Sequence, residues 1–82
     1  LGQYPRASEL FQQRLAIARK IGDRQGEAIA LTGLGNTYFA QKQPQQVIEV
    51  YQKALAIARE IGNRDGESGI LNNLGGAYRD LG

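Results

Sequence analysis

Cysteine, histidine, methionine and tryptophan are all absent from this chain of 82 residues. Without cysteine, disulfides and thiol chemistry are impossible, and the composition fits a reducing compartment, so we expect a cytoplasmic location. Without cysteine and histidine, the usual zinc sites, nucleophile pairs and histidine pH switches are excluded. We therefore predict a protein that is not an enzyme, with no catalytic residue, no bound metal and no cofactor.

Charge of one sign and long apolar runs are also scarce. Ten basic residues stand against eight acidic ones, a net charge of +2. The basic residues are scattered, whereas a nucleic-acid stripe needs them clustered on one face. No apolar run approaches the length of a membrane span. We therefore expect neither a nucleic-acid nor a membrane partner.

The chain instead repeats itself at a spacing of 40 residues. Residues 1–42 laid over residues 41–82 without a gap give 17 identities in 42 pairs, where chance gives about two or three. The segment Leu15–Arg19, for example, returns unchanged as Leu55–Arg59. A gapless repeat of this length is typical of stacked supersecondary units, each of which buries its apolar face on its neighbours.

The apolar residues within each unit recur every three or four positions, as on one face of a helix. Turn residues separate these stretches, and the connections are only two or three residues long, so successive helices must pack antiparallel. The sequence therefore predicts an all-α solenoid of antiparallel helix pairs. Its four helices are expected near 5–21, 24–41, 44–61 and 64–81.

Specific residues mark the ends of these helices. Gly22 and Gly62 follow the apolar stretches and suit the left-handed position after a helix. Asp23 and Asn63 come next and can cap the following helix. Pro44 suits a first helical turn.

Acidic residues follow two of these caps. Glu27 and Glu67 lie in the first turns of the second and fourth predicted helices. A carboxylate there complements the helix dipole. The sequence thus assigns them a local structural role.

Two glycines lie in the middle of predicted helices, where glycine costs about 1 kcal/mol relative to alanine. They are Gly35 and its counterpart Gly75. Because they recur at the repeat spacing, we expect them to let a neighbouring helix approach closely.

The segment Leu31-x-x-Leu34-Gly35-x-x-Tyr38 and its repeat over residues 71–78 resemble the first helix of a tetratricopeptide repeat (TPR). Tyr51 and Ala54 match the aromatic and small positions of the family's second helix. In the opening helix Phe11 keeps the aromatic position, whereas Arg14 replaces the small residue.

The spacing of 40 residues is similar to an extended subclass of the family, whose common repeat is shorter. The resemblance implies a single TPR-like repeat domain over residues 1–82. One whole repeat, at about 25–62, is flanked by two half repeats, and we expect the chain to be part of a longer repeat protein.

The resemblance also implies a function, because TPR-like stacks present their first helices along a concave groove that holds a peptide or protein segment. Positions matching the groove-lining sites are Ile29, Thr32, Gly33, Asn36, Phe39, Ala40, Gly69, Asn72, Asn73, Gly76, Arg79 and Asp80. Our candidate peptide-binding residues among them are Thr32, Asn36, Phe39, Asn72, Asn73 and Arg79.

Each candidate has a binding role and a structural alternative. The asparagines can hold an extended backbone, or can be solvated or bonded within the stack. Arg79 can pair with a carboxylate or be an ordinary surface charge. Phe39 is either an exposed anchor or an end contact.

The repeat and its resemblance leave two functional classes. The first is a non-catalytic scaffold that binds a protein or peptide in the groove. The alternative is a self-assembly module that stacks head to tail through exposed apolar ends, giving a homo-oligomer.

Overall fold

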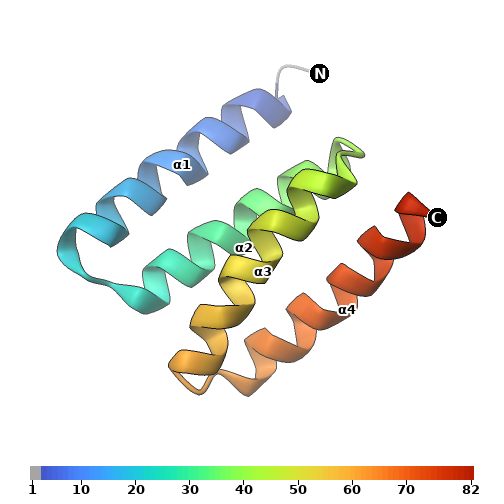
Figure 1. Ribbon diagram of the computed structural model, residues 1–82. Coiled ribbons are helices and arrows are strands. Elements are labelled where there is room, and N and C mark those ends of the chain that lie inside the picture. Colours follow the sequence, from blue (N-terminus) through green and yellow to red (C-terminus); the bar gives the residue numbers. More distant parts are fainter. Residues whose placement is uncertain (1–2) are drawn as a thin grey trace.

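The computed structural model describes residues 3–82, and the protein is all-α, as the sequence predicts (Figure 1). Within the described residues the four helices are α1 (Gln3–Ile21), α2 (Arg24–Ala40), α3 (Pro44–Glu60) and α4 (Arg64–Leu81). The predicted bounds agree to within two residues. The largest difference is at α1, which begins before Pro5 and so places this proline in the first turn.

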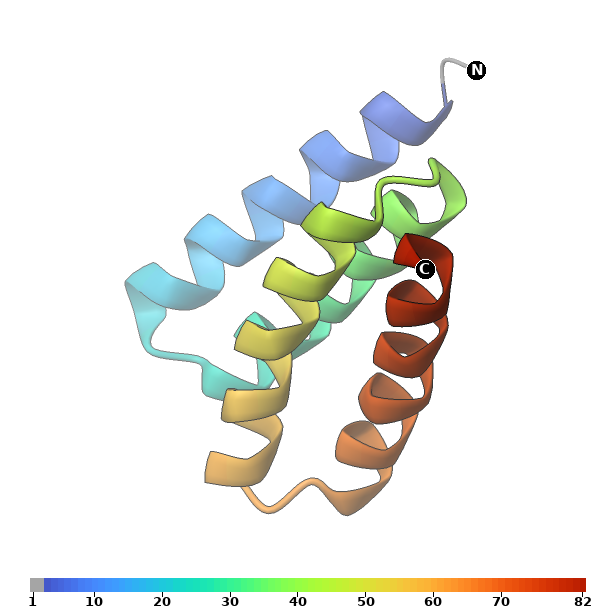
Figure 2. The ribbon, with the colours of Figure 1, turned by 45° about the vertical axis from the view of Figure 1, so that its right-hand side comes forward.

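The helices pack in chain order, each against the one before and the one after it. Figures 1 and 2 show α1 and α4 on the two outer edges, with α2 and α3 between them. Successive helices run antiparallel because their connections are too short for any other return. The predicted arrangement of antiparallel helix pairs is therefore confirmed.

The two connections that contain a glycine show the helix-ending and helix-capping features that the sequence predicts. Gly22 and Gly62 are left-handed, with φ of 73° and 72°. The side chains of Asp23 and Asn63 accept hydrogen bonds from the backbone N–H groups of Gly26 and Gly66, at 2.9 and 3.0 Å. The connection between α2 and α3 differs, because Lys42 takes the left-handed conformation with φ of 59°.

The core lies mainly between α2 and α3. Its fully or almost fully buried side chains include Leu31, Leu34, Val47, Tyr51, Ala54, Ile57 and Ala58. At its centre the ring of Tyr51 lies directly on Gly35, where even a Cβ atom would overlap it. Gly35 thus serves the close helix approach that the sequence predicts.

None of the helices within residues 3–82 combines the length and hydrophobicity needed to cross a bilayer.

Candidate functional site

A hollow of about 400 Å³ lies between α2 and α4, the two helices that match the family's first helices. The end of α3 and the connection to α4 close it at one side, and Phe11 of α1 contributes at the other. Its lining residues are Phe11, Gln25, Ala28, Ile29, Thr32, Gly33, Asn36, Ala58, Ile61, Asn63, Gly66 and Ile70. We call this the groove hollow.

The groove hollow is largely apolar. Ile29 on α2 is 50% exposed and Ile61, just after α3, is 39% exposed. Ile70 on α4 lies deeper and is buried. Exposed isoleucine side chains around one hollow offer a binding surface for another apolar side chain.

Local backbone features create this shape. Gly33 faces the ring of Phe11 so closely that a Cβ atom at this position would overlap it. Gly62, with its positive φ, ends α3 and turns the chain beside Ile61.

Two of the candidate asparagines are bonded to the core. The buried Tyr51 hydroxyl donates to Oδ1 of Asn36 on α2, and Nδ2 of Asn73 on α4 donates to the same hydroxyl oxygen at 3.2 Å. Burial raises the pKa of Tyr51, while the hydrogen bond from Asn73 opposes that shift. One tyrosine of α3 therefore links the two helices of the groove, and the side chains of Asn36 and Asn73 are held in place.

Two further candidates, Thr32 and Phe39, line two different hollows. Thr32 lines the groove hollow, but its hydroxyl donates to the backbone carbonyl of Ala28 at 2.8 Å. Phe39 is 42% exposed, and its ring lies beside Gly76, next to a smaller hollow that also includes Asp80.

Asn72 and Arg79 are both exposed on α4, and they line neither of these two hollows. The structure thus brings Thr32 and Asn36 together, with Asn73 joined to Asn36 through Tyr51. Phe39 and Arg79 lie near each other beside Gly76, within 3.6 Å of the position that a Cβ atom would take there, and Asn72 stands apart.

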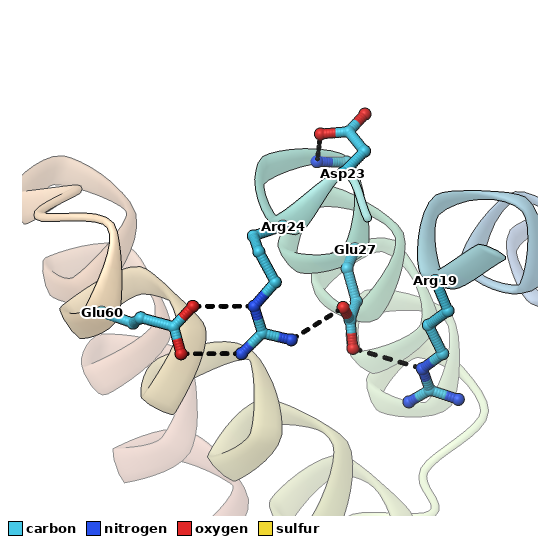
Figure 3. A network of polar contacts seen from close by, with 6 residues as sticks. Arg19, Asp23, Arg24, Glu27 and Glu60 are labelled. Carbon is cyan, nitrogen blue, oxygen red and sulfur yellow. Dashed lines mark hydrogen bonds and ion pairs between the residues drawn. The ribbon is translucent and has the colours of Figure 1, made fainter. Parts of the chain in front are cut away.

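A chain of ion pairs crosses α1, α2 and α3 beside the connections (Figure 3). Glu27 accepts from Arg19 at 3.2 Å and from Arg24 at 2.9 Å. Arg24 reaches on to Glu60 with two bonds, at 2.7 and 2.8 Å. The bonds to Glu60 raise the pKa of Arg24, and the bond from Arg24 lowers the pKa of Glu60.

Part of this chain repeats in the second half, where Arg59 donates to Glu67 at 3.0 Å. The position of Glu27 in a first helical turn predicts only an interaction with the helix dipole, so sequence reasoning missed the ion pairs. The repeated order of arginine, arginine and glutamate around each connection is the signal that was available.

Sequence reasoning also missed Ile61, Ile70 and Gly66 in the groove hollow. The apolar periodicity places Ile61 in the stripe of a helix that ends at residue 61. In the structure α3 ends at Glu60, and Ile61 follows it as the capping residue, with a side chain that is 39% exposed.

Comparison with known proteins supports the resemblance. The model of the family described as tetratricopeptide repeat matches residues 1–60 and again residues 27–82. No curated protein sequence shows significant similarity to the chain. The two matches together cover the whole chain, which therefore belongs to the tetratricopeptide repeat family.

Proposed function

We propose that this protein is a non-catalytic scaffold whose groove between α2 and α4 binds an extended segment of a protein partner. Repeats of this family generally mediate contacts between proteins. The period of 40 residues supports assignment to the extended subclass of the family. No cofactor is needed for such binding.

The observation that carries the proposal is the apolar lining of the groove hollow. Ile29, Ile61 and Ile70 come from three different elements and surround one concave site. Burying one large apolar side chain there is worth about 1.5–3 kcal/mol. The free amide hydrogens of Asn36 can bond the backbone of the same segment, so we expect a partner with a large aliphatic or aromatic residue at this point.

The repeat offers a matched pair of variants for the test. Ile61 lines the groove hollow, whereas its counterpart Ile21 is 69% exposed and does not line it. Both residues follow the same Leu-Ala-Ile-Ala-Arg segment and precede a glycine. Peptides are selected from a random display library on the wild-type chain, and their affinities are measured for Ile61→Ser and Ile21→Ser.

We expect Ile61→Ser to lower the affinity for the selected peptides by about tenfold, a factor that corresponds to 1.4 kcal/mol. Ile21→Ser should leave this affinity unchanged. Equal affinities for both variants would reject the groove hollow as the binding site. Circular dichroism checks that both variants keep their helices.

Head-to-tail stacking of copies stays an alternative prediction. The exposed apolar residues on α1 and α4, including Ile17 and Leu71, favour it. Arg14 and Lys20 on α1 are exposed and would place charge in such a contact, so we rank stacking second.

A further inference from the structure

One polar cluster of the groove occurs only once in the chain, although the sequence repeats. It consists of Tyr51, Asn36 and Asn73, and we call it the tyrosine–asparagine cluster. Their counterparts at the repeat spacing have no side-chain group that can form a hydrogen bond, and they are Phe11, Gly76 and Gly33 respectively. The cluster therefore marks a single point along the groove, and it can fix the position of a bound segment there.

The two asparagines of the cluster separate its tyrosine from solvent. Tyr51 on α3 is completely buried, whereas Asn36 on α2 is exposed and Asn73 on α4 is half-buried. Both amides bond the same hydroxyl group. A segment bound between α2 and α4 therefore contacts the two amides and not the hydroxyl.

The hydroxyl forces the two amides into opposite orientations, because a tyrosine has only one hydrogen to donate. In the structure this hydrogen is donated to Oδ1 of Asn36. Asn73 must then present its amide nitrogen, and its Nδ2 donates to the hydroxyl oxygen at 3.2 Å. Asn36 is left with its amide hydrogens for a ligand, and Asn73 is left with its carbonyl oxygen.

Both of these remaining groups are open. Within residues 3–82, neither Nδ2 of Asn36 nor Oδ1 of Asn73 has a hydrogen-bond partner. No described side chain that is buried or half-buried has a buried polar atom without a partner, so Oδ1 of Asn73 is accessible to solvent. Asn36 is exposed and lines the groove hollow.

A donor and an acceptor on neighbouring side chains match the two polar groups of a peptide backbone, its carbonyl oxygen and its N–H group. An α-helix already uses these groups for its internal hydrogen bonds. The tyrosine–asparagine cluster therefore favours an extended segment over a helix as the occupant of the groove.

We propose that Tyr51 is a positioning residue for groove binding. Its hydroxyl holds Asn36 as the donor and Asn73 as the acceptor for the backbone beside the residue that enters the groove hollow. This inference rests on the proposed function, and it adds which backbone groups are bound and what orients the amides that bind them. Without the hydroxyl, each amide can turn over and present the wrong atom, so part of the preorganisation is lost.

The test uses a peptide selected from the display library and a series of its variants, each with one backbone amide replaced by an ester. An ester has no N–H group, and its carbonyl oxygen is a weaker acceptor than that of an amide. We expect the wild-type chain to bind one ester, or two adjacent ones, about threefold to tenfold more weakly than the parent peptide, the range for one hydrogen bond.

Tyr51→Phe separates a positioning role from a structural one. We expect this variant to bind the parent peptide about threefold to tenfold more weakly, but to bind the sensitive ester as the wild type does, because that bond is already lost. A purely structural role would weaken the parent peptide and every ester by the same factor. Tyr78→Phe is the control, since its hydroxyl accepts one bond from Gln52 at an exposed position, and it should change no affinity.

The side-chain amide signals of the ¹⁵N-labelled chain test which asparagine is the donor. In the free protein, Tyr51→Phe should shift the amide signal of Asn73, which loses its acceptor, more than that of Asn36. Addition of the peptide to the wild type should then shift the amide signal of Asn36 more than that of Asn73. The opposite pattern in both experiments would overturn the assigned orientation.

The affinities also distinguish failure of this proposal from failure of groove binding. An affinity that falls in Ile61→Ser but not in Tyr51→Phe would leave the groove as the binding site and reject the positioning role of Tyr51. Equal losses for the parent peptide and all esters in Tyr51→Phe would reject it as well. Affinities unchanged in both Ile61→Ser and Tyr51→Phe would reject the groove itself. Circular dichroism checks that all variants are folded at the temperature of the measurement.

Discussion

At the scale of single residues, Tyr51 joins the core to the groove. Its ring fills the space over Gly35, and its hydroxyl bonds Asn36 and Asn73 on the two neighbouring helices. A substitution of either asparagine intended to test peptide binding therefore also removes a bond within the stack. Ile61 and Ile21 make a cleaner comparison, because neither takes part in these bonds.

We expect Tyr51→Phe to lower the free energy of unfolding by about 1 kcal/mol, because two partly buried hydrogen bonds lose their shared partner. Urea unfolding measures the change. Tyr78→Phe is the matched control, since the Tyr78 hydroxyl makes one bond at an exposed position, and its effect should stay within about 0.5 kcal/mol. Equal losses in the two variants would contradict the linking role of Tyr51.

Alkaline pH gives a second test of the same residue. Burial raises the pKa of Tyr51 in the folded protein, so its neutral form stabilises the fold below the unfolded pKa of about 10. That contribution to stability is lost as the pH rises through the higher pKa that Tyr51 has in the folded protein. We therefore expect the wild type to lose more stability than Tyr51→Phe above pH 10. Parallel curves for the two proteins would show that Tyr51 ionises as freely as in the unfolded chain.

Acid pH tests the ion pair between Arg24 and Glu60. The bonds from Arg24 lower the pKa of Glu60 in the folded state, so the carboxylate adds stability above its unfolded pKa of about 4.3. This contribution to stability disappears as the pH falls through the pKa that Glu60 has in the folded protein. The wild type should therefore be more stable than Glu60→Gln at pH 7 and equal to it in strong acid. A difference that does not change with pH would argue against the pair.

Some of these residue roles could be predicted from the sequence and some could not. Gly22, Gly62, Asp23 and Asn63 act through their own backbone position, so local sequence is sufficient to predict them. The bond between Tyr51 and Asn36 depends on side-chain rotamers and helix separation, which no spacing encodes. For the same reason the sequence could not separate a binding role for Asn36 from bonding within the stack.

At the scale of helices, the same sequence position has different neighbours in the two halves. Gly35 lies under Tyr51, whereas nothing lies within 4 Å of a Cβ placed on Gly75. The repeat predicts a close approach of a neighbouring helix at both glycines. The structure has this approach only at Gly35, where α3 packs on α2.

This contrast predicts substitutions of opposite sign. Gly35→Ala should destabilise the protein by roughly 1–3 kcal/mol, because the Tyr51 ring must move. Gly75→Ala should stabilise it by up to about 1 kcal/mol, because alanine favours the helix and meets no neighbour. Thermal unfolding of both variants measures the effect, and a change of the same sign in both would contradict the different environments described for them.

Helix bounds were well predicted because end signals and apolar periodicity agree at each connection. The place of Ile61 was not predicted. The predicted helix of residues 44–61 includes it in the apolar stripe, whereas in the structure it follows the end of α3 and lines the groove hollow. The connection at Lys42 was also not anticipated, because lysine carries no signal for a left-handed conformation.

At the scale of the whole molecule, the repeat determines the arrangement. Seventeen identities at a spacing of 40 residues place equivalent residues in equivalent helices, and antiparallel stacking follows from the short connections. The groove hollow could be predicted in its location but not in its apolar character, because its lining combines residues from all four helices and one connection.

The most direct test of groove binding is a chemical-shift map of the ¹⁵N-labelled chain titrated with a peptide selected from the display library. We expect the largest shifts at Ile29, Gly33, Ile61 and Ile70, where the peptide would enter the groove hollow. Shifts confined to Leu71, Gly75 and Tyr78, which are exposed on α4, with the groove residues unchanged, would contradict the proposed function.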